Sequence, residues 1–384
     1  MKIEVAKRDL EEALQVVSHS MSAGGGDLST HFLFRVTPGE TAKAEVRTHS
    51  GRLYAGCPFV ATVTESQFTA FTIEGKRLQS WMRSVPDAVL VFEFDGKNTT
   101  AKSPKGTQRF GSLDPQGFPH WDINLSTAKS TATLSAARLA EALGYCRRFA
   151  SDEESRSPQL CVCEVCNGVM CSTDKIAGTY LTVRGLEEST MRVHVKDVAA
   201  VLSFLGAISG TVEVLEHKHH TFFRRGDGAI CGESRFLADF PRTRKPPVTD
   251  LHEWTFPVAD LKSSIPFLVS GAEWEDTRLR FIPSEQEDGT VMLSMLNTTG
   301  VTTEVPVVCS EMKSGQDAVP VPKDGFVVAH PSLVKVLAPY TEGNVRIGIN
   351  PREKSGYLRV VETKEPEAGQ TEGDQYVTII AWLR

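Results

Sequence analysis

The sequence predicts an α+β fold in which one domain, with two helices and antiparallel sheets, occurs three times along the chain. Two observations lead to this expectation. Segments with apolar residues four apart, as one helical face requires, recur at intervals of roughly one domain length. In each third, a second such segment is followed closely by an alternating run typical of a strand. The 384 residues leave room for three such domains.

The first helix of each domain is expected where three segments share one apolar frame, with Leu10, Leu139 and Leu261 in equivalent positions. The three segments are Lys7–Leu14, Ala137–Leu143 and Ala259–Ile265. The second helices are expected at Arg77–Met82, Asp197–Leu202 and Ser332–Leu337, and the strands after them at Val89–Phe94, Val212–Leu215 and Val345–Ile349. The same order in all three thirds is hard to obtain by chance and predicts a threefold repeat.

The ends of the repeats indicate the domain boundaries. The first two thirds end in hairpin-like stretches that close on Phe118-Pro119 and Phe240-Pro241, and the last ends at Tyr376–Arg384. Pro, Lys and small polar residues cluster near Ser126–Ser130 and Lys245–Asp250. We therefore expect domains at 1–125, 126–248 and 249–384.

Composition narrows the class of protein. The chain is 40% hydrophobic and 23% charged, which is typical of a globular protein, and its net charge is −6. Binding to nucleic acid would therefore require Lys and Arg gathered on one surface of an otherwise acidic molecule. The charged N-terminal segment lacks the apolar core of a signal peptide, and no apolar run is long enough to span a membrane. Because no secretory signal is visible, we expect the eight cysteines to be reduced thiols of a cytoplasmic protein.

Two clusters could hold a metal ion, but each has a simpler interpretation. Cys161, Cys163, Cys166 and Cys171 lack the paired spacing of zinc knuckles, and Asn167-Gly168 among them is a strong signal for a two-residue hairpin turn. The histidines of the second cluster, His217, His219 and His220, are expected in an exposed turn between strands. No phosphate-binding loop, nucleophile elbow or His-Glu-x-x-His helix occurs. We expect no catalytic residue, metal or cofactor, with a Cys/His metalloenzyme as an alternative.

Several short segments resemble one known family, the beta sliding clamp of bacterial DNA polymerase III. These are Met1–Val5, Gly117–Pro119, Asp239–Pro241, Ser172–Ala177 and the terminal Tyr376–Leu383. The resemblance implies a head-to-tail homodimer in which six domains close a ring, with sheets outside and helices lining a hole. Duplex DNA would thread the hole, and the ring would tether a polymerase to it.

The sequence also departs from that family. Residues 23–30, after the first helix, carry neither the Arg nor the Pro typical of the family, which weakens the expectation of a DNA contact there. The terminus Ile380-Ala381-Trp382-Leu383-Arg384 differs from the family's Pro-Met-Arg-Leu type. Such divergence suggests a clamp encoded by a phage or mobile element.

A clamp must attract phosphates diffusely, because base-specific contacts would stop it from sliding. The candidate DNA-facing residues are the cations in or beside the six repeat helices: Lys7, Arg8, Lys76, Arg77, Arg83, Arg138, Arg147, Arg148, Lys196, Lys262 and Lys335.

The resemblance also implies two protein-binding surfaces. Short peptide motifs of the polymerase and the clamp loader would fill an apolar pocket between the second and third domains, formed by Leu160, Thr173, Lys175, Ile176, Pro241, Lys245, Val377, Ile379, Ile380, Ala381, Trp382 and Leu383. The dimer interface would include Phe110 of the first domain, facing Leu268 and Val269 of the third domain of the partner subunit. The alternatives are a clamp-like interaction scaffold that does not close a ring, and a sequence-specific nucleic-acid-binding module, although no compact basic motif for the latter is visible.

Overall fold

The structure is a computed structural model of the chain. It describes residues 2–22, 24, 27–37, 43–64, 69–206, 209–235, 240, 252–271, 278–284, 289–296, 302–315, 320–352, 355–363 and 375–381. The described chain forms two compact units. The first comprises residues 1–144, 165–167 and 185–237, and the second comprises residues 145–164, 168–184 and 238–384. Each unit is described by itself below.

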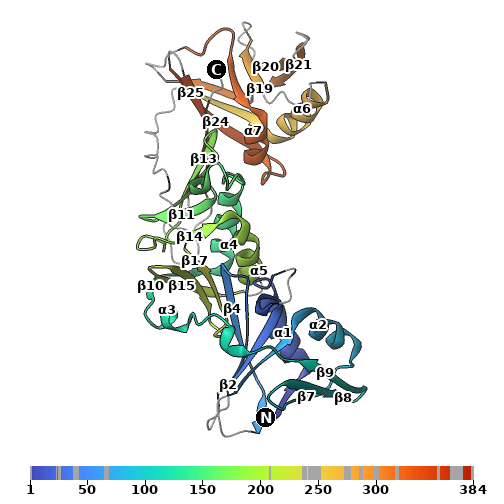
Figure 1. Ribbon diagram of the computed structural model, residues 1–384. Helices are drawn as coiled ribbons and strands as arrows, with labels where there is room; N and C mark the ends of the chain where they lie inside the picture. The colour runs from blue at the N-terminus through green and yellow to red at the C-terminus, as the bar shows by residue number, and fades with distance from the viewer. Residues whose placement is uncertain are drawn as a thin grey trace. The chain divides into compact units, whose positions relative to one another are not determined.

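The first unit contains two antiparallel sheets (Figure 1). One has the strand order β5-β1-β7-β8-β9, and the other has the order β10-β15-β16-β17-β4-β3-β2-β6. The strands of these sheets are β1 (Lys2–Ala6), β2 (His31–Thr37), β3 (Lys43–His49), β4 (Leu53–Phe59), β5 (Thr62–Thr64), β6 (Thr69–Glu74), β7 (Val89–Phe94), β8 (Asn98–Ser103), β9 (Gly106–Gly111), β10 (Lys129–Ser135), β15 (Thr211–His217), β16 (His220–Arg225) and β17 (Ile230–Ser234). Strand β14 (Arg192–His194) belongs to neither sheet.

The second unit contains a run of seven consecutive sheet strands, β12-β13-β26-β25-β24-β18-β22, and a separate sheet β21-β20-β19-β23. The strands are β12 (Val169–Thr173), β13 (Ala177–Thr182), β18 (His252–Pro257), β19 (Arg278–Pro283), β20 (Thr290–Leu296), β21 (Thr302–Val308), β22 (Glu311–Ser314), β23 (Phe326–Ala329), β24 (Asn344–Arg352), β25 (Ser355–Thr363) and β26 (Gln375–Ala381). Strand β11 (Val162–Cys166) lies where the chain passes from one unit to the other.

The α-helices of the described residues are α1 (Lys7–Ser18), α2 (Gly75–Ser84), α3 (Asp122–Ser126), α4 (Ala136–Arg147), α5 (Val195–Gly206), α6 (Val258–Gly271) and α7 (His330–Leu337). All except the short α3 begin at the residue directly after a strand. Their apolar residues form the expected stripe: α1, for example, buries Leu10, Ala13, Leu14 and Val17. Short 3-10 helices lie at Leu28–Thr30, Pro115–Gly117 and Pro158–Leu160.

The threefold repeat is confirmed by one backbone contact that occurs three times. In each repeat, the first residue of the first helix donates its N–H to a carbonyl. That carbonyl belongs to the residue just before the strand that follows the second helix. The bonds run from Lys7 to Ala88 at 2.9 Å, from Ala136 to Gly210 at 2.8 Å and from Val258 to Gly343 at 2.9 Å. The register of the strand pair β1–β7 recurs as well, since Ala6 faces Val89, Ser135 faces Thr211 and Pro257 faces Asn344. The α+β class and all six repeat helices are as the sequence predicts.

Candidate functional site

Exposed cations lie on four of the repeat helices. Six of the eleven cations singled out in the sequence are exposed: Arg8, Lys76, Arg77, Arg83, Arg147 and Lys196. Arg8 pairs with Glu12 at 3.0 Å and Arg77 with Glu74 at 2.9 Å, both as exposed neighbours on or beside their own helix. Such exposed pairs contribute little free energy, so a phosphate could replace the carboxylate at small cost.

The other five cations are partly buried: Lys7, Arg138, Arg148, Lys262 and Lys335. Lys7 donates from Nζ to the carbonyl of Val85 at 2.9 Å, which ties α1 to the end of α2. Lys262 donates to the carbonyls of Ala338 and Tyr340, at the end of α7. Because these two lysines hold pairs of helices together within their units, their ammonium groups are less available to contact DNA.

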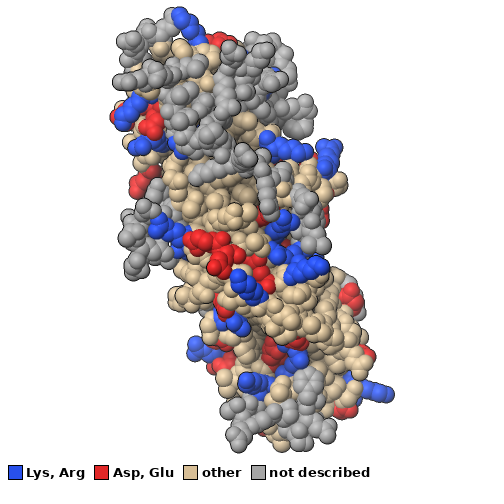
Figure 2. Space-filling view, turned by 90° about the vertical axis from the view of Figure 1, so that its left-hand side faces the viewer, with Lys and Arg blue, Asp and Glu red and all other residues tan. Residues whose placement is uncertain are grey.

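The surface is not uniformly basic. On the face in Figure 2, Lys and Arg side chains stand beside Asp and Glu side chains rather than in one large field of a single sign. A diffuse attraction for phosphates would therefore come from local groups of cations on the helices, not from the molecule as a whole.

Three of the residues singled out for a partner pocket, Thr173, Lys175 and Ile176, lie at the turn between β12 and β13. The Asp174 carboxylate accepts from the N–H groups of Ile176 at 3.0 Å and Ala177 at 2.8 Å, and Lys175 takes a positive φ of 81°. Lys175 Nζ donates to Ser157 Oγ at 2.8 Å, beside Leu160. Ile176 is 42% exposed.

Strand β26 brings the end of the chain to the same turn. It pairs with β13 so that Ile380 faces Ala177, and Ala381 donates its N–H to the carbonyl of Ile176 at 3.0 Å. Val377 and Ile380 are buried, Ile379 is half-buried and Ala381 is exposed, whereas Leu160 is buried. The remaining candidates, Pro241, Lys245, Trp382 and Leu383, lie outside the described residues. The structure thus gathers three separate chain segments around one turn.

An ion pair joins this turn to helix α7. Lys335 Nζ lies 3.1 Å from Asp174 Oδ2, with the two side chains 37% and 21% exposed. The sequence interpretation placed Lys335 among the DNA-facing cations and the turn in the partner pocket, and did not foresee that they touch. No pattern in the sequence signals a contact between positions so far apart.

Each sheet of the described chain ends in two edge strands, and β9 and β21 are among them. Along β9, residues alternately bond to β8 and turn their backbone groups away from it. The bond from Ser112 N–H to Lys97 O sets this alternation, so the backbone groups of Thr107 and Arg109 face outward. In β21, the bond from Cys309 N–H to Gly289 O shows which residues bond to β20 and which face outward. Pro306 is at an outward-facing position, so its lack of an N–H costs no bond to β20.

The apolar candidates for a dimer interface are mostly inside their own domain. Phe110 is 3% exposed and packs edge-on against Trp81, and Leu268 is fully buried, while Val269 is half-buried. The exposed apolar side chain at that end of α6 is Phe267, at 60%. The sequence interpretation missed Phe267; the proline before it at position 266, inside the helix, is the only local signal.

Neither the Cys cluster nor the His cluster forms a metal site in the part of the chain that the structure describes. Among the described residues, no group of three or more His, Cys, Asp or Glu side chains is placed to hold a metal ion. Cys161 and Cys163 are buried, and Asn167 and Gly168 both have positive φ, as the predicted two-residue turn requires. The ring of His220 stacks on Phe222, and burial lowers its pKa. No helix of the described residues is long and apolar enough to span a membrane.

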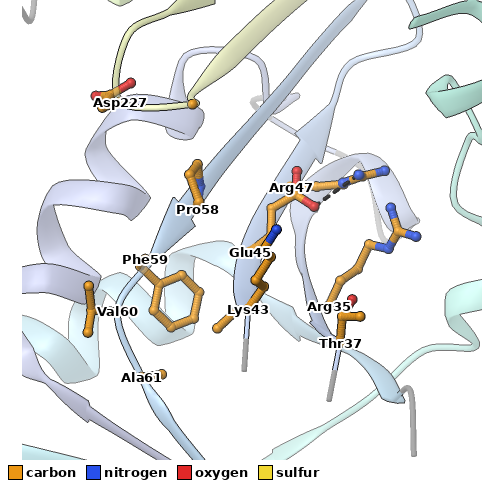
Figure 3. Close-up of a pocket in the computed structure, with 12 residues that line it drawn as sticks. Arg35, Thr37, Lys43, Glu45, Arg47, Pro58, Phe59, Val60, Ala61 and Asp227 are labelled. Atoms are coloured by element: carbon orange, nitrogen blue, oxygen red, sulfur yellow. Dashed lines mark ion pairs between the residues drawn. The ribbon is translucent and has the colours of Figure 1, made fainter. Parts of the chain in front are cut away.

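The first unit also has a pocket of about 550 Å³ on the face of β2, β3 and β4, which the sequence did not indicate (Figure 3). Its polar wall is already neutralised within the chain. Arg47 pairs with Glu45 at 2.9 Å and binds both carboxylate oxygens of Asp122 at 2.8 Å, and Arg35 shares Asp122 at 3.0 Å. Despite the opposing effect of burial, these bonds hold the pKa of Asp122 below its usual value. These bonds are structural ion pairs of the two arginines in the pocket wall.

No protein-family model and no curated protein matches this sequence. Solved structures do match it, over its whole length. The DNA polymerase III subunit beta from Pseudomonas aeruginosa matches with a TM-score of 0.79 and 14% identity, with 100% of both chains covered. The beta subunit from Thermotoga maritima (TM-score 0.74, 16%) and the sliding clamp from Bacillus subtilis (TM-score 0.79, 13%) match 100% of this chain and 99% of their own.

These likenesses establish the fold. The chain is built on the fold of the DNA sliding clamps. Within that class it is the fold of the bacterial DNA polymerase III beta subunit, at a low sequence identity that marks this chain as divergent.

Proposed function

We propose that this protein is a DNA sliding clamp: a non-enzymatic processivity factor that encircles duplex DNA and tethers a replicative polymerase to it. The observation that carries the proposal is the likeness to polymerase III beta subunits over the entire chain, together with the strand–helix contact that is repeated in all three thirds. A topological function requires no catalytic group. The proposal places the domains at 1–125, 126–248 and 249–384 and the protein in the cytoplasm.

The proposed DNA-facing surface consists of the repeat helices. Their exposed cations lie on α1, α2, α4 and α5, and among them Arg8 and Arg77 form weak exposed ion pairs. Contacts of this kind are independent of base sequence, which a ring that slides requires.

The proposed partner site is the turn between β12 and β13 with strand β26 beside it. Of its apolar components, Ile176 is exposed and Ile379 is half-buried, and the exposed Lys175 adds a cation beside them. A short peptide segment of a polymerase or clamp loader, with one or two apolar side chains, is the proposed occupant.

Ring closure would pair the free edges of two subunits. Strand β9 of one subunit would lie against β21 of the next, so that both edges are satisfied. Arg109 on β9 and Glu304 on β21 are both exposed and opposite in charge, and Phe267 and Val308 supply exposed apolar surface in the same unit as β21. The same head-to-tail contact made twice gives a closed homodimer.

Solution mass by light scattering tests the proposal. We expect a homodimer at micromolar concentration. Arg109→Pro should give a folded monomer, because the Arg109 N–H faces away from β8 and its loss spares the ladder, as Pro306 does in β21. Phe267→Asp should also give a folded monomer, because the side chain is 60% exposed within its own subunit.

The matched control is Val334→Asp, which places the same charge at a 46% exposed apolar position on α7. It should remain a dimer. A wild-type monomer would support the alternative of a clamp-like scaffold without ring closure, and a dimer in both interface variants would mean that the subunits associate elsewhere.

A further inference from the structure

We propose that Lys335 is shared between DNA and the partner site: on free clamp it holds Asp174 and thereby positions the partner-binding turn, and on DNA it moves to a phosphate and releases that turn. This inference rests on the proposed clamp function. It adds a coupling between the two binding surfaces that neither the fold nor the individual sites imply.

Asp174 holds the backbone of the turn. One carboxylate oxygen, Oδ1, accepts two backbone N–H groups, from Ile176 and Ala177, and so fixes the backbone that carries the exposed Ile176 side chain. The other oxygen, Oδ2, pairs with Lys335 at 3.1 Å. The carboxylate therefore stands between the backbone of the turn and a cation on α7.

The turn needs this support. Lys175 has a positive φ, a conformation that is unfavourable for a residue with a side chain. The backbone closes the turn with one bond, from Asp174 N–H to Ala177 O at 3.2 Å. Side chains add to it: Thr173 Oγ1 donates to Ala177 O at 2.8 Å and accepts from Lys175 N at 3.1 Å. Weakening Asp174 affects the segment that presents Lys175 and Ile176 to a partner.

Lys335 is accessible to a competing anion, because its side chain is 37% exposed. The preceding residue of α7, Val334, is 46% exposed. A partly exposed ion pair contributes little free energy. The free energy of one exposed contact between a lysine and a phosphate is comparable. Exchange between the two anions is therefore nearly balanced, as a coupling device requires.

Hydrogen–deuterium exchange of the Ile176 and Ala177 amides tests the inference directly, with a 30-base-pair duplex as the DNA probe. Saturating duplex should speed exchange of both amides about 2- to 5-fold in the wild type, the range expected when a partly exposed ion pair is lost. In Lys335→Met, exchange should already be fast without DNA and should not change when DNA is added.

Lys262→Met is the matched control. It removes another predicted DNA-facing cation from the same unit, but one that donates to the carbonyls of Ala338 and Tyr340 rather than to Asp174. At equal saturation with duplex it should show the wild-type response. If duplex binds to the wild type without altering the two amides, or alters them equally in Lys335→Met, the coupling is wrong while the clamp function stands. Failure to bind duplex at all would overturn the clamp function itself, and the coupling with it.

Discussion

At the scale of single residues, the most unusual group is the carboxyl of Glu233 on β17. It is 1% exposed; Oε1 accepts the His194 N–H at 2.6 Å, and Oε2 has no hydrogen-bond partner among the described residues. Burial raises the pKa of Glu233 well above its ordinary value, and the Asp197 carboxylate raises it further. The folded protein therefore keeps Glu233 protonated at a pH at which the unfolded chain ionises it.

A group with a raised pKa stabilises the fold fully below its unfolded pKa, about 4.5, and loses that contribution as the pH rises toward the folded value. Glu233→Gln keeps an acceptor for His194 and removes the titration. We expect the variant to match the wild type near pH 4.5 and to be more stable at pH 8 by about 1–2 kcal/mol, the cost of a poorly satisfied buried group. Urea unfolding at the two pH values measures the difference.

Glu213→Gln is the control with the opposite sign. A hydrogen bond from Ser130 and the ion pair with Arg224 lower the pKa of Glu213, so its contribution is present above its unfolded pKa. This variant should be slightly less stable at pH 8. An equal loss of stability in Glu233→Gln at both pH values would show that the carboxyl is needed for packing and not for its proton.

At the scale of elements, substitutions at two glycines with similar φ angles distinguish the cost of backbone strain from the cost of steric overlap. Gly325 (φ 76°) precedes β23, and a Cβ there would overlap the carbonyl oxygen of Phe281 on the paired strand β19. Gly343 (φ 85°) precedes β24, and a Cβ there would meet nothing within 4 Å. We expect Gly343→Ala to cost about 1 kcal/mol, from the positive φ alone.

Gly325→Ala adds the overlap to the same strain and should cost about 3 kcal/mol or more. Thermal unfolding of the two variants side by side gives the comparison. Similar losses in both would mean that β19 and β23 separate easily, contrary to their paired register.

Elements and their order were predictable because the signals are local. Apolar residues four apart in Lys7–Leu14 or alternating in Val89–Phe94 are set by neighbours in the chain, and the structure has a helix and a strand there. Exposure was less predictable: on α6, next to Pro266, the buried residue is Leu268 and the exposed one is Phe267.

The contacts of the candidate site were not predictable at all. The Lys335–Asp174 ion pair and the pairing of β13 with β26 join residues far apart in the sequence, and periodicity within a short window carries no information about such partners. The resemblance to a family assigned these segments to one pocket, which stays a prediction, and it gave no indication of the bonds between them.

At the scale of the whole molecule, a net charge of −6 must be reconciled with DNA binding. The global field repels DNA, so attraction has to come from cations close enough to release counterions from the phosphates. The exposed cations of the repeat helices are the proposed source. Because Lys7 and Lys262 are bound to carbonyls within their own units, we expect their loss to affect stability more than DNA affinity.

The dependence of DNA affinity on salt tests this distribution of charge. Changing Arg8, Lys76, Arg77, Arg83, Arg147 and Lys196 to Gln removes the exposed helix cations. If each contacts a phosphate, the slope of log affinity against log salt should become less steep by roughly 5 per chain, since each contact contributes about 0.9. Fluorescence anisotropy of a labelled duplex at several salt concentrations measures the slope.

The control removes the same number of exposed cations from strands and turns: Lys43, Lys97, Lys102, Lys129, Lys218 and Arg346. Both variants have the same net charge, so any effect of the global field is equal in the two. We expect the control to keep the wild-type slope. An equally reduced slope in the control would mean that DNA is held by the overall charge and not by the helices, and the proposed DNA-facing surface would then be wrong.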